Sequence, residues 1–388
     1  MSGDGKSLRR ITSVLDDTLP ESIDRRSFLQ ASAAGLVTGT LAGCLGNDGG
    51  SGPETSDTIL RQPWDATPTW AFAHVGLQKG HWDDAGVTPP NVKTGENSPD
   101  TARRVGTGEE AMGHGDWAST TSGLAEGYNL QMFGNSRNRQ ILTFFYVKDQ
   151  LAGEDDLENA NVALASPFAE VTWPVYPSVV GVNPDDVGSA EFAEQEVVTG
   201  LLESGEVNAV WGSLQQLAVY QRQLDLEFGV SPLGTHADIY GYPFFANGEW
   251  ISDDENVDYA VGVLEGYSKA QRWCMLNPDE TLDILINEVN TALQAQERAQ
   301  LEDELKVAVT LSMGEEVKQN GLGSITAGKT QETLDVVGDA LVDNPGDLPS
   351  GEDLVLADIQ DQAELATFDD DEYSQVKDYA GRWNEYFL

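Results

Sequence analysis

The chain is poor in cysteine, poor in basic residues and without long apolar runs. It has 2 cysteines, and its 22 lysines and arginines stand against 65 aspartates and glutamates, giving a formal charge of −43. Two cysteines are too few for a disulfide framework or for a metal site built from several thiolates. The acidic excess would repel nucleic acid and anionic membrane surfaces, which excludes both as binding partners.

Several kinds of catalytic and cofactor site are also missing. The histidines His74, His81, His114 and His236 do not stand at the spacings of metal ligands, such as HxH or HExxH. The chain has no P-loop and no glycine-rich dinucleotide motif, and residues 229–234 lack the G-x-S-x-G pattern of a nucleophile elbow. We therefore predict no metal, no cofactor, no catalytic residue and no enzymatic activity.

The first 43 residues carry a sorting pattern. Arg25 and Arg26 precede a short stretch rich in alanine and glycine, which ends in Leu-Ala-Gly before Cys44. A membrane-spanning helix needs about 20 strongly apolar residues, more than this stretch offers. The pattern resembles a twin-arginine export signal with a lipobox, so we expect residues 1–43 to be removed and Cys44 to carry lipid. Residues 44–57 are expected to form a flexible tether.

The remaining composition indicates a folded protein from a salty environment. Hydrophobic residues make up 40% of the chain, which is enough for a sizeable core. Acidic residues are spread along the sequence rather than gathered in a tail. Such a composition resembles that of proteins working in near-saturated salt, where screening removes the repulsion among carboxylates. We expect a halophilic, haloarchaeal source.

From residue 58 onward, β-rich runs alternate with helical patterns, which is typical of an α/β fold. Thr67, Ser98 and Ser166, each before a proline, are expected to cap helices. Strands are expected at 58–61, 92–94, 111–116, 130–133, 141–147, 161–165 and 207–211, with a return to the first unit near 239–245. Expected helices are 67–80, 118–126, 193–203, 215–225, 257–275, 279–289, 292–311, 330–341 and 373–386.

Four segments, in this order, resemble motifs of one family. They are 74–87 (HVGLQKGHWDDAGV), 109–116 (EEAMGHGD), 204–211 (SGEVNAVW) and 277–280 (NPDE). They are similar to segments of the ABC-transporter solute-binding proteins for nitrate, sulfonate, taurine and thiamine precursors. The resemblance implies a type II periplasmic-binding-protein-like fold, in which two α/β lobes with mixed sheets flanked by helices close around a ligand, and the C-terminal part is helical. Residues 58–142 would begin the first lobe, 143–240 would form the second, and 241–388 would return to the first.

Together with the export-signal pattern, this resemblance implies a function. The chain would be a monomeric lipoprotein, held by Cys44 on the outer face of the cell membrane, that captures a small molecule and passes it to an ABC permease. The breadth of the anion-binding branches favours a small anion such as a sulfonate, taurine or nitrate.

Candidate ligand-binding residues follow from a general rule. In open α/β sheets, ligands gather where strands end and helices begin. Arg137 or Arg61 is expected to pair with the anion, unless a nearby acid already holds that arginine in an ion pair. The residues selected are Trp64, Asp65, Thr67, Gly115, Asp116, Trp117, Ser136, Arg137, Ser166, Phe168 and Trp211.

Three alternatives stay open. A heteroaromatic ring such as a hydroxymethylpyrimidine thiamine precursor would stack on Trp64, Trp117 or Trp211, with Asp65 or Asp116 bonding its nitrogens. The family resemblance also includes fungal pyrimidine synthases, which use pyridoxal phosphate and a cysteine-rich segment that this chain lacks, so an exported pyrimidine-related enzyme is the weaker alternative. An adhesion or signalling module would require a large exposed apolar patch.

Overall fold

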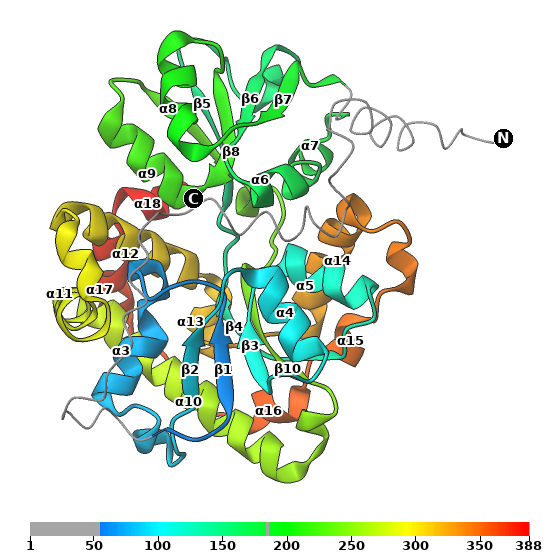
Figure 1. Ribbon diagram of the computed structural model, residues 1–388, viewed down its shortest axis with the longest axis vertical. Coiled ribbons are helices and arrows are strands. Elements are labelled where there is room, and N and C mark those ends of the chain that lie inside the picture. The colour runs from blue at the N-terminus through cyan, green and yellow to red at the C-terminus, as the bar shows by residue number, and fades with distance from the viewer. Residues whose placement is uncertain (1–54, 184–185, 388) are drawn as a thin grey trace, which may run out of the picture. The chain divides into compact units, whose positions relative to one another are not determined.

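The computed structural model describes residues 55–183 and 186–387, and its strands form two five-stranded sheets (Figure 1). The first sheet has the order β2-β1-β3-β10-β4 and the second β7-β6-β8-β5-β9. The first contains β1 (Ile59–Gln62), β2 (Asn91–Thr94), β3 (Met112–His114), β4 (Leu130–Arg137) and β10 (Tyr242–Asn247). The second contains β5 (Leu142–Val147), β6 (Asn161–Leu164), β7 (Ser189–Phe192), β8 (Ala209–Ser213) and β9 (Phe228–Pro232). We call the parts built on these sheets the first and second lobes.

Both sheets are mixed in the same way. β1 pairs in parallel with β2 and β3, and β6 pairs in parallel with β7 and β8. An antiparallel strand, β10 in the first lobe and β5 in the second, then joins the parallel strands to the last strand of each sheet. The chain passes between the lobes twice, from β4 to β5 and from β9 to β10.

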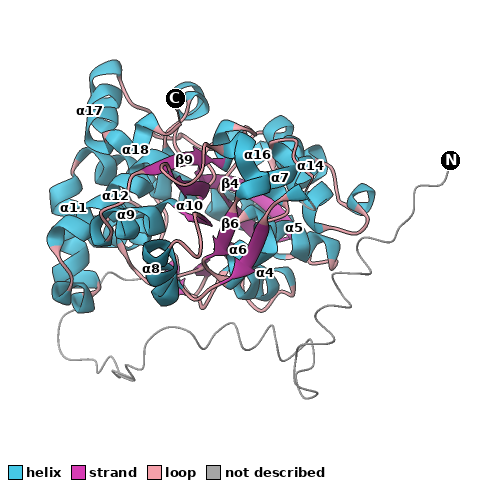
Figure 2. Cartoon of the chain, turned by 90° about the horizontal axis from the view of Figure 1, so that it is seen from above, coloured by secondary structure: helices cyan, strands magenta, loops and turns pink. Residues whose placement is uncertain are grey.

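Helices lie on both sides of the strands (Figure 2). They are α3 (Ala71–Lys79), α4 (Ser98–Gly106), α5 (Trp117–Ala125), α6 (Pro167–Thr172), α7 (Val175–Val179), α8 (Gln195–Ser204), α9 (Leu214–Gln223), α10 (Asp254–Leu276), α11 (Pro278–Ile284), α12 (Arg298–Ser312), α13 (Glu315–Asn320), α14 (Ala327–Leu341), α15 (Gly351–Leu354), α16 (Ala357–Gln362), α17 (Asp370–Ala380) and α18 (Arg382–Glu385). Together with the two mixed sheets, they confirm the predicted fold class. Within the described residues, no helix has the length and apolar character needed to cross a membrane.

The predicted helix caps are partly right. Ser166 caps α6, because its hydroxyl accepts a hydrogen bond of 3.0 Å from the amide of Ala169. The prediction of Ser98 is wrong by one residue: Asn97 caps α4 by accepting from the amide of Asp100 at 2.8 Å. Thr67 stands at the cap position of a short 3-10 turn before α3, but its side chain makes no capping bond.

Other boundaries differ from the predicted ones. β7 and β9 were not predicted as strands at all; they are the two edge strands of the second sheet. The expected helix at 292–311 begins only at Arg298, after a 3-10 turn at Thr291–Ala295. The expected helix at 373–386 is broken at Gly381, where a φ of 54° takes the backbone out of the helical region.

Close packing positions the helix that begins beside the inter-lobe region. α3 packs on α10, and a Cβ added to Gly76 would lie 2.5 Å from the Cβ of Ala270. Only glycine permits this approach of α3 to α10. Cys274, also on α10, is fully buried, as predicted, and burial raises the pKa of its thiol to about 12. The predicted export signal, Cys44 and residues 44–54 of the tether lie outside the described residues.

Candidate functional site between the lobes

The two lobes contact each other beside the start of α3. Trp70 and Ala118 of the first lobe belong to the same buried apolar cluster as Trp211 of the second. Gln215, at the start of α9, donates a hydrogen bond of 3.0 Å from Nε2 to the hydroxyl of Thr69. The segment that leads into α3 is therefore one part of the first lobe that meets the second; α12 is another, because its Asp303 pairs with Arg222 of α9.

Arg137 is buried next to this contact. It ends β4, just before the first crossing between the lobes, and is 1% exposed. Its guanidinium donates hydrogen bonds to the carbonyls of Ser136 and Thr69 and, at 3.1 Å, to the hydroxyl of Ser312. All these acceptors are neutral, and within the described residues Arg137 takes part in no ion pair. Arg137 is thus a buried cation without a counter-ion in the part of the chain that the structure describes.

Aromatic side chains surround this cation. The guanidinium carbon lies 5.6 Å from the ring centroid of Trp70 and 5.0 Å from that of Phe72, both within cation–π range. Tyr242 meets the Trp70 ring edge-on at 5.1 Å. Burial lowers the pKa of Arg137, whereas Tyr267 and Tyr242 act in the opposite direction. We call Trp70, Phe72, Tyr242 and Tyr267 the aromatic box; all four are buried.

Two of the predicted site residues lie at this box. Arg137 is its centre, and Ser136 adjoins it: the Ser136 hydroxyl donates to the carbonyl of Tyr242 at 3.2 Å, and its own carbonyl accepts from Arg137 at 3.1 Å. Asp116 lies close enough that its charge raises the pKa of Tyr242, although burial of Tyr242 is the larger cause.

Asp116 and Gly115 have structural partners. Asp116 caps α5: its carboxylate accepts from the amide and the hydroxyl of Ser119, at 2.8 and 2.7 Å. Burial raises the pKa of Asp116, while the hydrogen bonds from Ser119 and Ser98 lower it. Gly115 donates a long hydrogen bond of 3.4 Å from its amide to the carbonyl of Pro243, which ties the end of β3 to β10.

The predicted tryptophans do not gather around Arg137. Trp211 is fully buried in the second lobe and donates from Nε1 to the hydroxyl of Thr172 at 3.1 Å. Trp117 is fully buried in a different apolar cluster of the first lobe. Trp64 is 38% exposed. In this structure Trp211 and Trp117 present no open ring face.

The other predicted residues are spread over both lobes. Asp65 is exposed, and its carbonyl accepts from the amide of Thr67 at 2.8 Å. Ser166 acts as the cap of α6, and Phe168 packs partly buried against the core of the second lobe.

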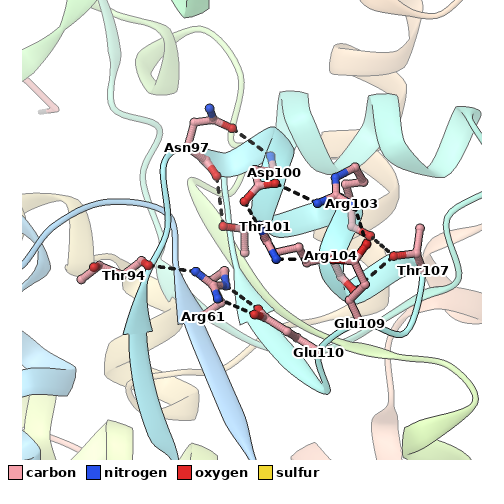
Figure 3. Close-up of polar contacts among 10 residues, drawn as sticks. All are labelled: Arg61, Thr94, Asn97, Asp100, Thr101, Arg103, Arg104, Thr107, Glu109 and Glu110. Carbon is pink, nitrogen blue, oxygen red and sulfur yellow. Dashed lines mark hydrogen bonds and ion pairs between the residues drawn. The ribbon is translucent and has the colours of Figure 1, made fainter. Parts of the chain in front are cut away.

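Arg61, the other arginine expected to meet an anion, already has an acidic partner (Figure 3). Its guanidinium pairs with both carboxylate oxygens of Glu110 and donates to the carbonyl of Thr94 at 2.9 Å. A second network of Arg103, Arg104, Asp100 and Glu109 lies beside it on and after α4 (Figure 3). Arg61 is therefore held in an ion pair, and of the two arginines expected to meet an anion only Arg137 is left for a ligand.

Sequence reasoning missed Trp70, Tyr242, Tyr267 and a neighbouring histidine, His114. His114 lies on β3, with its ring centroid 5.3 Å from that of Trp70 and 4.9 Å from that of Phe244. The rule that selects strand ends passes over these residues: Tyr267 lies within α10, Tyr242 begins β10, and His114, the last residue of β3, falls inside the strand expected at 111–116. Only long-range strand pairing and packing bring them together.

A separate cavity of about 390 Å³ is lined by residues of the second lobe and by Tyr386 of the first. Among its lining residues, the Ser231 hydroxyl lies 2.7 Å from Nε2 of His236 and 2.5 Å from Oε2 of Glu154. Glu154 also approaches the same Nε2, at 3.0 Å. In a Ser–His–acid triad the acid bonds the other ring nitrogen and orients the base. This cluster lacks that arrangement.

Solved proteins of low sequence identity share the fold. The periplasmic aliphatic sulphonate-binding protein SsuA from Escherichia coli is 13% identical, with a TM-score of 0.57 over 79% of this chain and 100% of that one. The ligand-binding component of an ABC-type import system from Staphylococcus aureus, solved with zinc bound, is 13% identical, with a TM-score of 0.56 over 80% and 100%. The alkanesulfonate-binding protein SsuA from Xanthomonas axonopodis pv. citri, bound to MOPS, is 12% identical, with a TM-score of 0.51 over 78% and 99%.

The family assignment comes from the sequence. No curated protein matches the chain. Residues 67–281, more than half of the chain, match the family model described as NMT1/THI5 like. This stretch begins at Thr67, just before α3, and ends in α11, so it contains Arg137, the aromatic box and the whole second lobe. The chain belongs to the NMT1/THI5-like family.

Proposed function

We propose that the protein is the solute-binding component of an ABC importer and that it captures a small organic or inorganic anion, such as a sulfonate, taurine or nitrate. The observation that carries this proposal is Arg137, a buried guanidinium that has no carboxylate partner among residues 55–183 and 186–387. Burying a lone charge costs several kcal/mol. A bound oxyanion would offset that cost and would meet the planar donor geometry that favours arginine over lysine.

The proposed binding site lies between the lobes. The first lobe would comprise 58–142 and 241–388, and the second 143–240. Because Arg137 and the whole aromatic box are buried, an anion reaches Arg137 only when the lobes move apart and is enclosed when they close again. Related folds include sulphonate-binding proteins from two bacteria, which supports a receptor rather than an enzyme. The Ser231 cluster adds no support for an enzyme, because its acid and its serine contact the same nitrogen of His236.

We further propose that the protein is exported through the twin-arginine route and tethered to the outer face of the cell membrane by lipid on Cys44, next to its permease, as a monomer. Fractionation of producing cells tests this. Cys44→Ser should move the protein from the membrane to the medium, and Arg25→Lys with Arg26→Lys should keep it inside the cell. An unchanged distribution in the first variant would contradict the anchor; export of the second would contradict the route.

The acidic composition supports a protein that works in concentrated salt. With a formal charge of −43, repulsion among carboxylates opposes the folded state unless salt screens it. The free energy of unfolding should therefore rise steeply between dilute buffer and molar KCl. A protein equally stable in both would contradict a halophilic origin.

One observation favours a second ligand class. Trp70 and Tyr242 stand against Arg137, so a heteroaromatic ring such as a hydroxymethylpyrimidine could stack there. A thermal-shift screen separates the two classes, using nitrate, taurine, ethanesulfonate, hydroxymethylpyrimidine and thiamine in molar KCl. A ligand at about 100 times its dissociation constant adds roughly 2.7 kcal/mol, which raises Tm by a few degrees. Shifts with anions only would support the anion receptor; shifts with rings only would replace it; no shift on folded protein would remove both.

A further inference from the structure

His114 is a buried histidine whose two ring nitrogens have no hydrogen-bond partner within the described residues. Its side chain is 1% exposed. A neutral imidazole has one donor nitrogen and one acceptor nitrogen in either tautomer. Leaving such a buried group unpaired is unfavourable, because the group loses the hydrogen bonds to water that it makes in the unfolded chain. The unpaired ring nitrogens of His114 therefore destabilise the folded first lobe, unless a bound ligand completes their hydrogen bonds.

Its protein neighbours are mostly rings. Phe244, its register partner on the antiparallel strand β10, stacks on it with the centroids 4.9 Å apart. Trp70 meets it edge-on at 5.3 Å and Tyr267 at 6.4 Å. This packing fixes the plane of the imidazole but provides no partner for its nitrogens.

His114 and Arg137 belong to one site, because they share neighbours. Trp70 contacts both the His114 ring, at 5.3 Å, and the Arg137 guanidinium, at 5.6 Å. Tyr267 approaches the His114 ring from α10 and also acts on the ionisation of Arg137. An anion held at Arg137 between these rings is therefore near His114 as well.

The charged and titratable groups around His114 oppose its protonation in the free protein. Burial lowers the pKa of His114 most, followed by the charge of Arg137 on β4 and that of His74 on α3. The phenol of Tyr267 on α10 also faces the ring, whereas Tyr242 on β10 faces Trp70 and has Asp116 near it. A bound anion would cancel the effect of Arg137 and attract a proton to the ring.

We propose that His114 is a second polar contact of the anion held at Arg137, and that one proton passes from solvent to the imidazole when the anion binds. This inference rests on the proposed anion-receptor function. The ligand class that fits is an oxyanion with at least two acceptor oxygens. One oxygen would accept from the Arg137 guanidinium and another from the N–H of the His114 imidazolium. No bond other than the N–H bond of the ring forms, and no oxidant or reductant is needed.

The sign of the pH dependence follows from this coupling. In the free protein His114 is neutral over the physiological range, and in the complex its pKa is higher. Between those two values the complex holds one more proton than the free protein, so affinity rises as pH falls, by up to about tenfold per pH unit. A histidine that serves only as a packed ring would give no such dependence.

Isothermal titration of the full chain carrying Cys44→Ser tests the inference, with ethanesulfonate, taurine and nitrate as probes at about pH 7.5, 6.5 and 5.5 and constant chloride. We expect tighter binding at lower pH, and a binding enthalpy that varies with the ionisation enthalpy of the buffer, as uptake of up to one proton requires. His114→Gln should keep measurable binding but lose the pH dependence. His81→Gln, a histidine away from the box, should keep it.

Each contrary outcome has a distinct meaning. Binding of the same strength at every pH overturns the role of His114 and leaves the anion receptor intact. Loss of the pH dependence in His74→Gln, with its retention in His114→Gln, assigns the proton to His74 and overturns the inference. No binding of any probe by folded protein at any pH removes the proposed function and the inference with it.

Discussion

Gln215 of the second lobe donates a hydrogen bond of 3.0 Å to the hydroxyl of Thr69, whose carbonyl accepts from Arg137 in the first lobe. Thr69 thus connects the second lobe to the buried guanidinium of Arg137. The bond exists only while the lobes are in contact at this point.

The first prediction concerns this bond. Gln215→Ala should weaken the affinity for a bound anion by about fivefold, mainly through faster dissociation, because a neutral hydrogen bond contributes about 1 kcal/mol. Stopped-flow or titration measurements on ethanesulfonate would show it. Gln223→Ala is the matched control: it lies on the same helix but bonds Thr199 within the second lobe, at 3.2 Å. If both variants changed the affinity equally, the hydrogen bond between Gln215 and Thr69 would not stabilise the closed complex.

The second prediction concerns the ion pair of Arg61 and Glu110, whose side chains are 13% and 6% exposed. Arg61→Met should lower the free energy of unfolding by about 3 kcal/mol, because it leaves a buried carboxylate unpaired. Arg104→Met, which breaks a more exposed pair with Asp100, should cost at most about 1 kcal/mol. Urea unfolding of both variants checks this. Similar losses of unfolding free energy would contradict the prediction that Glu110 is left as a buried, unpaired carboxylate.

The third prediction separates the capping role of Asp116 from a ligand role. Asp116→Asn should be close to wild type in stability, because the amide oxygen still accepts from Ser119 and no charge is buried. Asp116→Ala should cost about 1–2 kcal/mol. Since the partners of the carboxylate are Ser119 and Ser98 of the protein itself, we expect unchanged affinity for ethanesulfonate in Asp116→Asn. A clear loss of affinity there would identify Asp116 as a ligand contact, as first predicted from the sequence.

The fourth prediction is acid sensitivity from His74. Burial lowers its pKa to about 4, whereas an unfolded chain has a value of about 6.5. As pH falls from about 6.5 towards 4, the unfolded chain takes up a proton that the folded protein does not, so stability falls, by up to about 3 kcal/mol. His74→Phe should lose less stability than wild type between about pH 7 and 5 in urea unfolding. Equal losses in the two proteins would contradict this origin.

The fold could be predicted from the sequence to the extent that local patterns carry it. The alternation of β-rich and helical runs is a local signal, and so is the cap at Ser166. The structure has strands and helices in the expected segments, and Ser166 caps α6. β7 and β9 were missed because both are edge strands: β7 is polar, and β9 contains Gly229 and ends at Pro232. The order of strands in each sheet was not predicted, since sheet pairing joins segments far apart in the chain.

The site could be predicted only in part. Ser136 and Arg137 were selected because they stand at the crossing between the lobes. His114 and Tyr267 were not, because nothing local distinguishes a histidine in a strand, or a tyrosine in a helix, from ordinary core residues. They meet through the pairing of β3 with β10 and the packing of α10 against the sheet. Trp117 and Trp211 were selected as residues at strand ends, but Trp117 begins α5, Trp211 lies within β8, and both are fully buried.

The most direct test of the central claim is the affinity of Arg137 variants for ethanesulfonate, taurine and nitrate, measured by isothermal titration on protein shown to be folded. We predict that Arg137→Met weakens binding by about 30-fold or more, and that Arg137→Lys is intermediate because it keeps the charge but not the planar donors. Arg139→Met is the control, since Arg139 lies nearby, also without an ion pair within the described residues, but bonds Thr310 and Asn384. Its binding should match wild type. Undiminished binding by Arg137→Met would contradict the account.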